Sequence, residues 1–162
     1  MVQPTLHITG AKQLKRALRE LPEAMQREAL EQALMESAQP MADAAKALAP
    51  VDEGRLEESI VVAKTLHKSQ QAFATSSPDE VQVYVGPNLQ RGAGPAGPHG
   101  HLNEFGTGPR YHETTGKYVG EMPAKPFLRP AFDATKKMVT RLLRPKLWNE
   151  IKRAAQRVRS NV

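Results

Sequence analysis

One cluster of side chains has the chemistry of a metal site: His99 and His101, followed by Glu104. Two imidazoles and a carboxylate could hold a zinc ion, and such a chain would be a metal-dependent hydrolase. The spacing matches no defined zinc motif, and the surrounding glycines and prolines give a site no rigid support. A solvated loop with incidental histidines is the better interpretation, and we predict neither a metal nor another cofactor.

No other segment carries the pattern of an active site. The sequence lacks a GxxxxGK[ST] phosphate loop and a GxSxG nucleophile elbow, and it has no cysteine. Residues 92–97 have the letters of GxGxxG, but they include a proline and no helix is expected to follow. The acid pairs Asp52/Glu53, Glu57/Glu58 and Asp79/Glu80 lie near turns and are best explained as surface charge. We therefore predict that the protein is not an enzyme.

The positive charge of the chain is concentrated at its C-terminal end. Residues 134–162 hold nine of the 23 Lys and Arg and one of the 17 acids, so the segment carries +8 and the rest −2. This asymmetry suggests a contact with nucleic acid or with the acidic face of a neighbouring subunit; a solvated helix face is the alternative. Trp148 is the only aromatic residue there, so sequence-specific base recognition is not expected. The candidate contact residues are Lys136, Lys137, Arg141, Arg144, Lys152, Arg153, Arg157 and Arg159.

The first third of the sequence predicts helices. Leu14, Ala17, Leu18 and Leu21 have the spacing of an amphipathic helix, and a second helix is expected over residues 23–48. Along this second helix, large apolar residues mark one face, and a row of alanines beside it would allow a neighbour to approach closely. The large-residue face comprises Leu30, Leu34, Met41, Ala45 and Leu48, and the alanines are Ala29, Ala33, Ala38 and Ala42. Pro40 should kink or split the helix.

The remainder predicts strands, loops and a closing helix. Residues 56–65 and 81–85 favour strands, whereas residues 86–100 and 106–125 are rich in glycine and proline and read as irregular. A final helix should begin at Pro130, break at Pro145 and continue as a basic helix. The predicted class is α+β, with a small antiparallel sheet, one domain over residues 1–145 and a basic helical extension over 146–162. No bilayer-spanning segment or signal peptide is recognisable, so cytoplasmic synthesis is expected.

Three segments together resemble a known family. They are residues 49–60 (APVDEGRLEESI), 103–107 (NEFGT) and 126–131 (PFLRPA). In this order they are similar to the neck or tail-component family of long-tailed bacteriophages, the tail-completion proteins, over roughly residues 5–145. Many members have threonine where this chain has Glu53, and the tail after Pro145 is longer and more basic than the family pattern. The matching positions are Gly54, Leu56, Ile60, Glu104, Phe105, Gly106, Thr107, Pro126, Phe127, Leu128, Arg129 and Pro130.

The resemblance implies a structural role in the virion. Proteins of this family form a ring at the head-proximal end of the tail, next to the head connector or stopper and the tail tube, and the genome passes through the lumen. Sixfold symmetry would match the tail tube and twelvefold the portal, with sixfold favoured. A ring contact is heterologous and closes by rotation, so subunits could share a thin, alanine-rich core. A small basic protein that binds DNA without sequence preference is the alternative function.

Within this resemblance the motif residues have local roles. Gly54 would permit a turn, and Leu56 and Ile60 would anchor the entry into a strand. Phe105 and Phe127 would be aromatic anchors, either in the core or between subunits, and Gly106 would allow a turn that lets Phe105 point inward. Because the second and third motifs occur together, Arg129 is expected to pair with Glu104. Ordinary maintenance of the fold is the alternative explanation for all of these positions.

Overall fold

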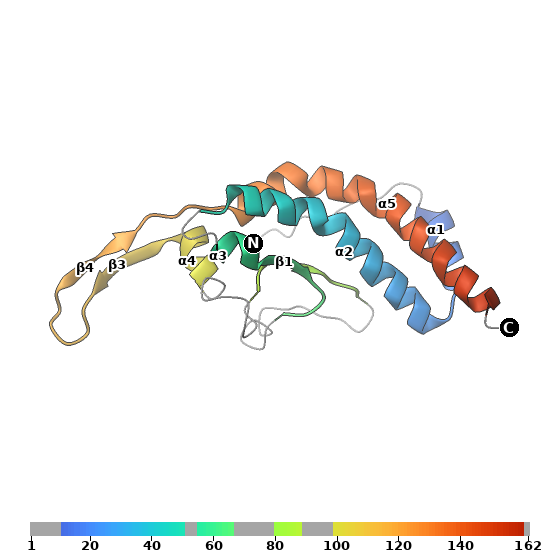
Figure 1. Ribbon diagram of the computed structural model, residues 1–162, viewed down its shortest axis with the longest axis horizontal. Coiled ribbons are helices and arrows are strands. Elements are labelled where there is room, and N and C mark those ends of the chain that lie inside the picture. The colour runs from blue at the N-terminus through green and yellow to red at the C-terminus, as the bar shows by residue number, and fades with distance from the viewer. Residues whose placement is uncertain (1–10, 51–54, 67–79, 89–98, 161–162) are drawn as a thin grey trace.

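The computed structural model describes residues 11–50, 55–66, 80–88 and 99–160. It has the mixed α+β class predicted from the sequence, with a helical N-terminal region, antiparallel strands and a C-terminal helix (Figure 1). Gly54 and the side chain of Arg159 lie outside the described residues. In chain order the elements are α1 (Ala11–Arg19), α2 (Glu23–Leu48), α3 (Arg55–Ser59), β1 (Ile60–Ala63), β2 (Tyr84–Pro87), α4 (Gly100–Phe105), β3 (Thr107–Tyr111), β4 (Tyr118–Met122) and α5 (Leu128–Ser160).

The two long helices, α2 and α5, lie side by side and run in opposite directions, and they form the body of the molecule (Figure 1). The face of α2 that is buried consists of small residues: Ala29, Ala33, Ser37, Ala38, Ala42 and Ala45. Short side chains let the helix axes approach closely, so the row of alanines forms the buried face, with Leu30 packed half-buried beside it. Leu48, expected on the apolar face, is 50% exposed.

The core divides into two clusters along this helix pair. At one end, Leu21 and two alanines of α2 pack against Leu147, Ile151 and Ala154 of α5, with α1 alongside. At the other end, Phe127, the residue before α5, and Ala131 of α5 pack against the last turns of α2, together with Leu56 and Ile60. Phe127 is fully buried and is the largest such side chain.

Strands β1 and β2 form a two-stranded antiparallel sheet against α2, with Ile60 opposite Pro87 and Ala63 opposite Tyr84. The strand expected over 56–65 is shorter than predicted, because residues 55–59 form helix α3, whose last residue, Ser59, donates its hydroxyl to the carbonyl of Leu56 at 2.7 Å. The valine alternation at 81–85 also misplaced the second strand, which begins at Tyr84.

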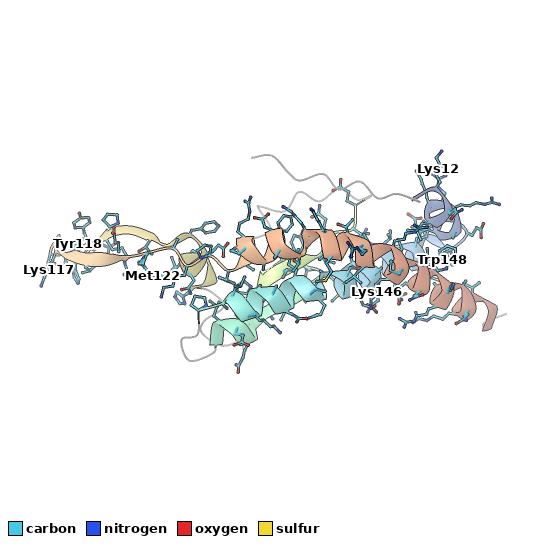
Figure 2. All side chains as sticks on the ribbon, turned by 90° about the horizontal axis from the view of Figure 1, so that it is seen from above. Lys12, Lys117, Tyr118, Met122, Lys146 and Trp148 are labelled. Atoms are coloured by element: carbon cyan, nitrogen blue, oxygen red, sulfur yellow. The ribbon has the colours of Figure 1, made fainter. Side chains whose placement is uncertain are left out.

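The stretch 106–125, expected to be irregular, instead contains a β-hairpin. Strands β3 and β4 pair antiparallel, with Thr107 opposite Met122 and Tyr111 opposite Tyr118, and the ladder has irregular register between them. We call residues 107–122 the arm, because the hairpin projects away from the helical body and ends at Lys117 and Tyr118 (Figures 1 and 2). The arm is therefore a second, separate sheet, not part of one small sheet.

Both long helices continue through a proline. Helix α2 spans 26 residues across Pro40, and α5 spans 33 residues across Pro145. The break predicted at Pro145 is wrong: the lost backbone hydrogen bond is outweighed by packing on both sides of it, with Leu143 and Leu147 in the same cluster. Residue 145 consequently lies inside one helix. Among the described residues, no helix is long and apolar enough to cross a membrane.

Candidate functional site

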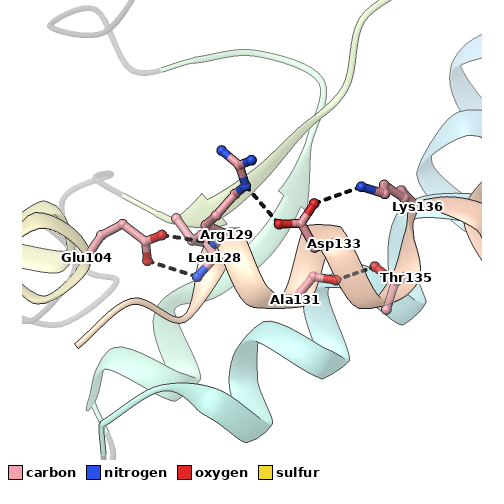
Figure 3. Close-up of polar contacts among 7 residues, drawn as sticks. All are labelled: Glu104, Leu128, Arg129, Ala131, Asp133, Thr135 and Lys136. Carbon is pink, nitrogen blue, oxygen red and sulfur yellow. Dashed lines mark hydrogen bonds and ion pairs between the residues drawn. The ribbon is translucent and has the colours of Figure 1, made fainter. Parts of the chain in front are cut away.

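Glu104, the buried carboxylate of α4, caps the first turn of α5. Its Oε2 accepts hydrogen bonds from the backbone N–H groups of Phe127 at 2.8 Å and Leu128 at 2.9 Å, and its Oε1 accepts one from Arg129 at 2.9 Å. Figure 3 shows the bonds from Leu128 and Arg129. The side chain is only 7% exposed. A carboxylate is well suited to this position, because the N-terminus of a helix carries partial positive charge and N–H groups without helical acceptors.

Pro130 completes this cap. The first helical hydrogen bond of α5 joins the N–H of Ala131 to the carbonyl of Phe127 at 3.3 Å. The four residues before Ala131 therefore have no helical acceptor: Glu104 serves three of them, and Pro130 has no N–H to satisfy. Pro130 is the third residue of α5, not the first as predicted, but it still lies in the first turn. This arrangement joins the EFGT and PFLRPA motifs: one supplies the acceptor and the other the donors.

A tight turn at Gly106 connects α4, which carries Glu104, to the first strand of the arm. Gly106 ends α4, donates its N–H to the carbonyl of Leu102 at 2.8 Å and adopts φ +71° and ψ −174°. The hydroxyl of Thr107 accepts the N–H of Met122 at 2.9 Å, and the carbonyl of Asn103 accepts the N–H of Lys125 at 2.7 Å. These bonds hold the returning strand against α4 immediately before α5 begins.

Replacing Gly106 by alanine is expected to lower the free energy of unfolding by about 2–4 kcal/mol. Its backbone conformation is essentially restricted to glycine, which costs other residues about 1–3 kcal/mol. A Cβ would also lie 2.7 Å from the carbonyl oxygen of Met122 and 2.8 Å from the nitrogen of Ala124. Gly116 is the matched control, since it has φ +62° and no atom within 4 Å of an added Cβ. The free energies of unfolding of Gly106→Ala and Gly116→Ala are measured by urea denaturation. The larger loss expected for Gly106→Ala comes from the close contact between the added Cβ and the backbone, and equal losses in the two variants would contradict this expectation.

Two of the aromatic motif residues have opposite environments. Phe127 is fully buried beside Leu56 and Ile60, which are 4% and 0% exposed, so all three serve the core. Phe105 is 80% exposed. The expectation that Gly106 turns Phe105 inward is therefore wrong: the turn exists, but the ring faces outward because Glu104, one residue earlier, takes the inward direction. The position in the core predicted as one alternative for Phe105 is therefore not the one it takes.

Arg129 meets Glu104 through its backbone and not through its charge. Its guanidinium Nε binds Asp133 at 2.8 Å, and Lys136 binds the other oxygen of Asp133 at 2.8 Å (Figure 3). The hydrogen bond from Lys136, followed by that from Arg129, lowers the pKa of Asp133. Asp133 raises the pKa of Arg129 in turn. The four-residue spacing of Arg129 and Asp133 is the signal from which this pair could have been predicted.

The remaining motif positions are ordinary. Leu128 is half-buried and packs on the cluster around Phe127, while Pro126 and Pro130 are exposed. The cluster that suggested a metal is not assembled as one: His99 and His101 are exposed, and both oxygens of Glu104 accept backbone N–H groups. No group of three or more potential metal ligands comes together within the described ranges.

Part of the basic C-terminal segment is neutralised by the molecule's own acids. Lys146 binds Glu36 of α2 at 2.8 Å, Arg157 binds Glu28 of α2 at 3.0 Å, and Arg153 binds Glu150 within α5. The hydrogen bond from Lys146 lowers the pKa of Glu36. For Lys146 and Arg157, the acidic partner expected on another subunit is thus helix α2 of the same chain. Sequence reasoning missed this because it treated the segment as a separate extension.

A comparison with protein families gives one match. The family model described as "Bacteriophage HK97-gp10, putative tail-component" matches residues 12–106, which is more than half of the chain. The matched region runs from α1 through α4 and includes Glu104, whereas the arm and α5 lie beyond it. No curated protein and no solved structure matches the chain.

Proposed function

Because this chain belongs to the HK97 gp10-like family of bacteriophage tail components, we propose that it is a ring-forming subunit at the head-proximal end of the tail. The ring completes the tail, contacts the head connector or stopper on one side and the tail tube on the other, and leaves a lumen for the genome. Its role is structural and not enzymatic. In support, Glu104, the carboxylate on which a hydrolase would depend, is fully engaged in capping α5.

The observation that carries this proposal is the arm. A two-stranded hairpin is marginally stable by itself in water, and its outer edges offer unpaired backbone groups to another chain. Tyr111, Tyr118 and Val119 of the arm are 62%, 52% and 52% exposed, and Phe105 stands at its base. A surface of this kind is typical of a segment that is completed by a partner.

The position of the arm favours a ring over a symmetric dimer. The arm projects from one end of an elongated molecule, and its tip at Lys117 and Tyr118 lies far from Trp148 at the other end (Figure 2). If the arm of one copy lies on the body of the next, the contact is heterologous, and repetition by rotation closes a ring. Sixfold symmetry is the arrangement we favour, because it matches the tail tube.

The first test is the mass of the purified protein by light scattering, followed by negative-stain imaging alone and with purified tails. Rings in solution, or monomers that form rings only on tails, support the proposal and supply the symmetry. A protein that stays monomeric both alone and in the presence of purified tails overturns the proposal.

Replacing Phe105 by serine is expected to leave the monomer folded and to weaken assembly. An exposed side chain contributes within about 0.5 kcal/mol to folding stability, whereas an aromatic anchor in an interface is worth about 2 kcal/mol or more. The dissociation constant of each contact should therefore rise about 30-fold or more, measured by light scattering over a dilution series. Val158, 36% exposed at the end of the molecule remote from the arm, provides the control Val158→Ser. Unchanged assembly of Phe105→Ser would remove Phe105 from the interface.

A further inference from the structure

The cations of α5 fall into two sets. One set is paired with acids: Lys136 with Asp133, Lys146 with Glu36, Arg153 with Glu36 and Glu150, and Arg157 with Glu28. The other set, which we call the cationic stripe, is Lys137, Arg141, Arg144 and Lys152. All four are exposed, and none forms an ion pair with a residue in the described part of the chain.

The cationic stripe is a single face of the helix. Arg141 follows Lys137 by four residues and Arg144 follows by three, and Trp148 then continues the row to Lys152 in steps of four. Residues at these spacings are neighbours on a helix surface, so the row extends about 22 Å at 1.5 Å per residue. Glu150 is the only acid between Lys137 and Lys152, and it is buried and paired with Arg153. The positive field along the stripe is therefore not cancelled locally.

The rigid spacing of the stripe fits a linear polyanion. Successive cations of the stripe lie about 6, 4.5 and 12 Å apart along the helix axis, distances of the same order as one to four times the 3.4 Å rise per phosphate on one DNA strand. The ammonium of Lys152 lies over the ring of Trp148, 5.8 Å from its centre, and so competes with a base for stacking on that face. The stripe therefore has groups for phosphates and none for reading bases.

We propose that the cationic stripe of α5 binds the phosphate backbone of duplex DNA without sequence preference. The inference goes beyond the proposed ring and does not depend on it, since a monomer carries the complete stripe. Binding in this mode releases counterions, so its strength must fall steeply with salt concentration.

The test measures binding of the full chain to a fluorescently labelled random duplex by anisotropy, over a range of salt concentrations. The variant replaces Lys137, Arg141, Arg144 and Lys152 together by glutamine, a good helix former. Each phosphate contact contributes about 0.9 to the slope of log K against log salt, so the slope should fall by about 3–4 in the variant. Between 50 and 200 mM salt, four contacts correspond to about a 100-fold loss of wild-type affinity.

Two controls make the result specific to the stripe. The first variant replaces four cations that lie outside α5, Lys46, Arg110, Lys117 and Lys125, by glutamine. It removes the same charge elsewhere and should keep the salt slope of the wild type. The second uses Trp148, the only tryptophan of the chain, whose fluorescence should change on adding duplex DNA because it lies within the stripe. Circular dichroism verifies that both variants keep their helices.

Three outcomes would overturn the proposal. They are equal losses of affinity in the two variants, no response of Trp148 to DNA, and binding of poly-glutamate as tight as that of duplex at equal charge. The last outcome would assign the stripe to an acidic protein surface instead.

Discussion

Replacing Glu104 by alanine is expected to lower the free energy of unfolding by about 3–5 kcal/mol. The change removes the acceptor of three backbone N–H groups at once, and hydrogen bonds to a charged group are worth about 1.5–3 kcal/mol each, less what water restores. The site is buried, so water can reach the orphaned N–H groups only if the first turn of α5 loosens. The measurement is urea denaturation followed by circular dichroism.

Two further variants show whether this loss comes from the cap. Glu104→Gln keeps one acceptor oxygen but presents an NH2 group to the remaining N–H donors, so it should fall between wild type and alanine. Glu121→Ala, at an exposed glutamate of the arm, should change stability by less than about 0.5 kcal/mol. If Glu104→Ala were as stable as Glu121→Ala, the cap would have no energetic role.

Replacing Phe127 by alanine is the second change with a large expected effect, again about 3–5 kcal/mol of unfolding free energy. The ring is fully buried, and four of the six other buried residues of its cluster are alanines: Ala42, Ala45, Ala49 and Ala131. Short side chains on two rigid helices cannot move to fill the cavity, which places the expected cost at the upper end of such substitutions.

The control for Phe127 is the phenylalanine of the other motif. Phe105→Ala removes the same atoms from an 80% exposed position and should cost less than about 0.5 kcal/mol in the monomer. The two variants are compared by denaturant unfolding at a concentration where the wild type is monomeric. If both variants lost the same free energy of unfolding, Phe105 would be buried, not exposed, in the monomer in solution.

Local propensity predicted the helices well and their packing poorly. The bounds expected for the second helix, 23–48, are those of α2, because helix formers fill the segment and prolines flank it. Which face is buried depends on the partner: α5 approaches the alanines closely and leaves Leu48 half exposed. Continuation of α5 through Pro145 likewise depends on tertiary packing, which no local rule contains.

Neither the arm nor the Glu104 cap could be predicted from local sequence patterns, for different reasons. Neither face of the arm is buried by the body, so its strands show no alternation of apolar and polar residues, and its glycines and prolines read as loop. The cap joins residues 23 to 25 positions apart, and what linked them beforehand was the family resemblance, which implies the co-occurrence of the two motifs. That co-occurrence correctly linked Glu104 to Arg129 but assigned the contact to the side chain instead of the backbone.

The Glu104 cap also couples the arm rigidly to the helix pair. Residues 123–127 connect the arm to α5. Without further contacts, the arm could rotate about this short connection relative to the helices. Glu104 clamps α4, at the base of the arm, directly onto the first turn of α5. In the proposed ring, a neighbour that pushes on Tyr118 at the tip would therefore apply torque to the whole helix pair, and a change in ring diameter would tilt α2 and α5 together.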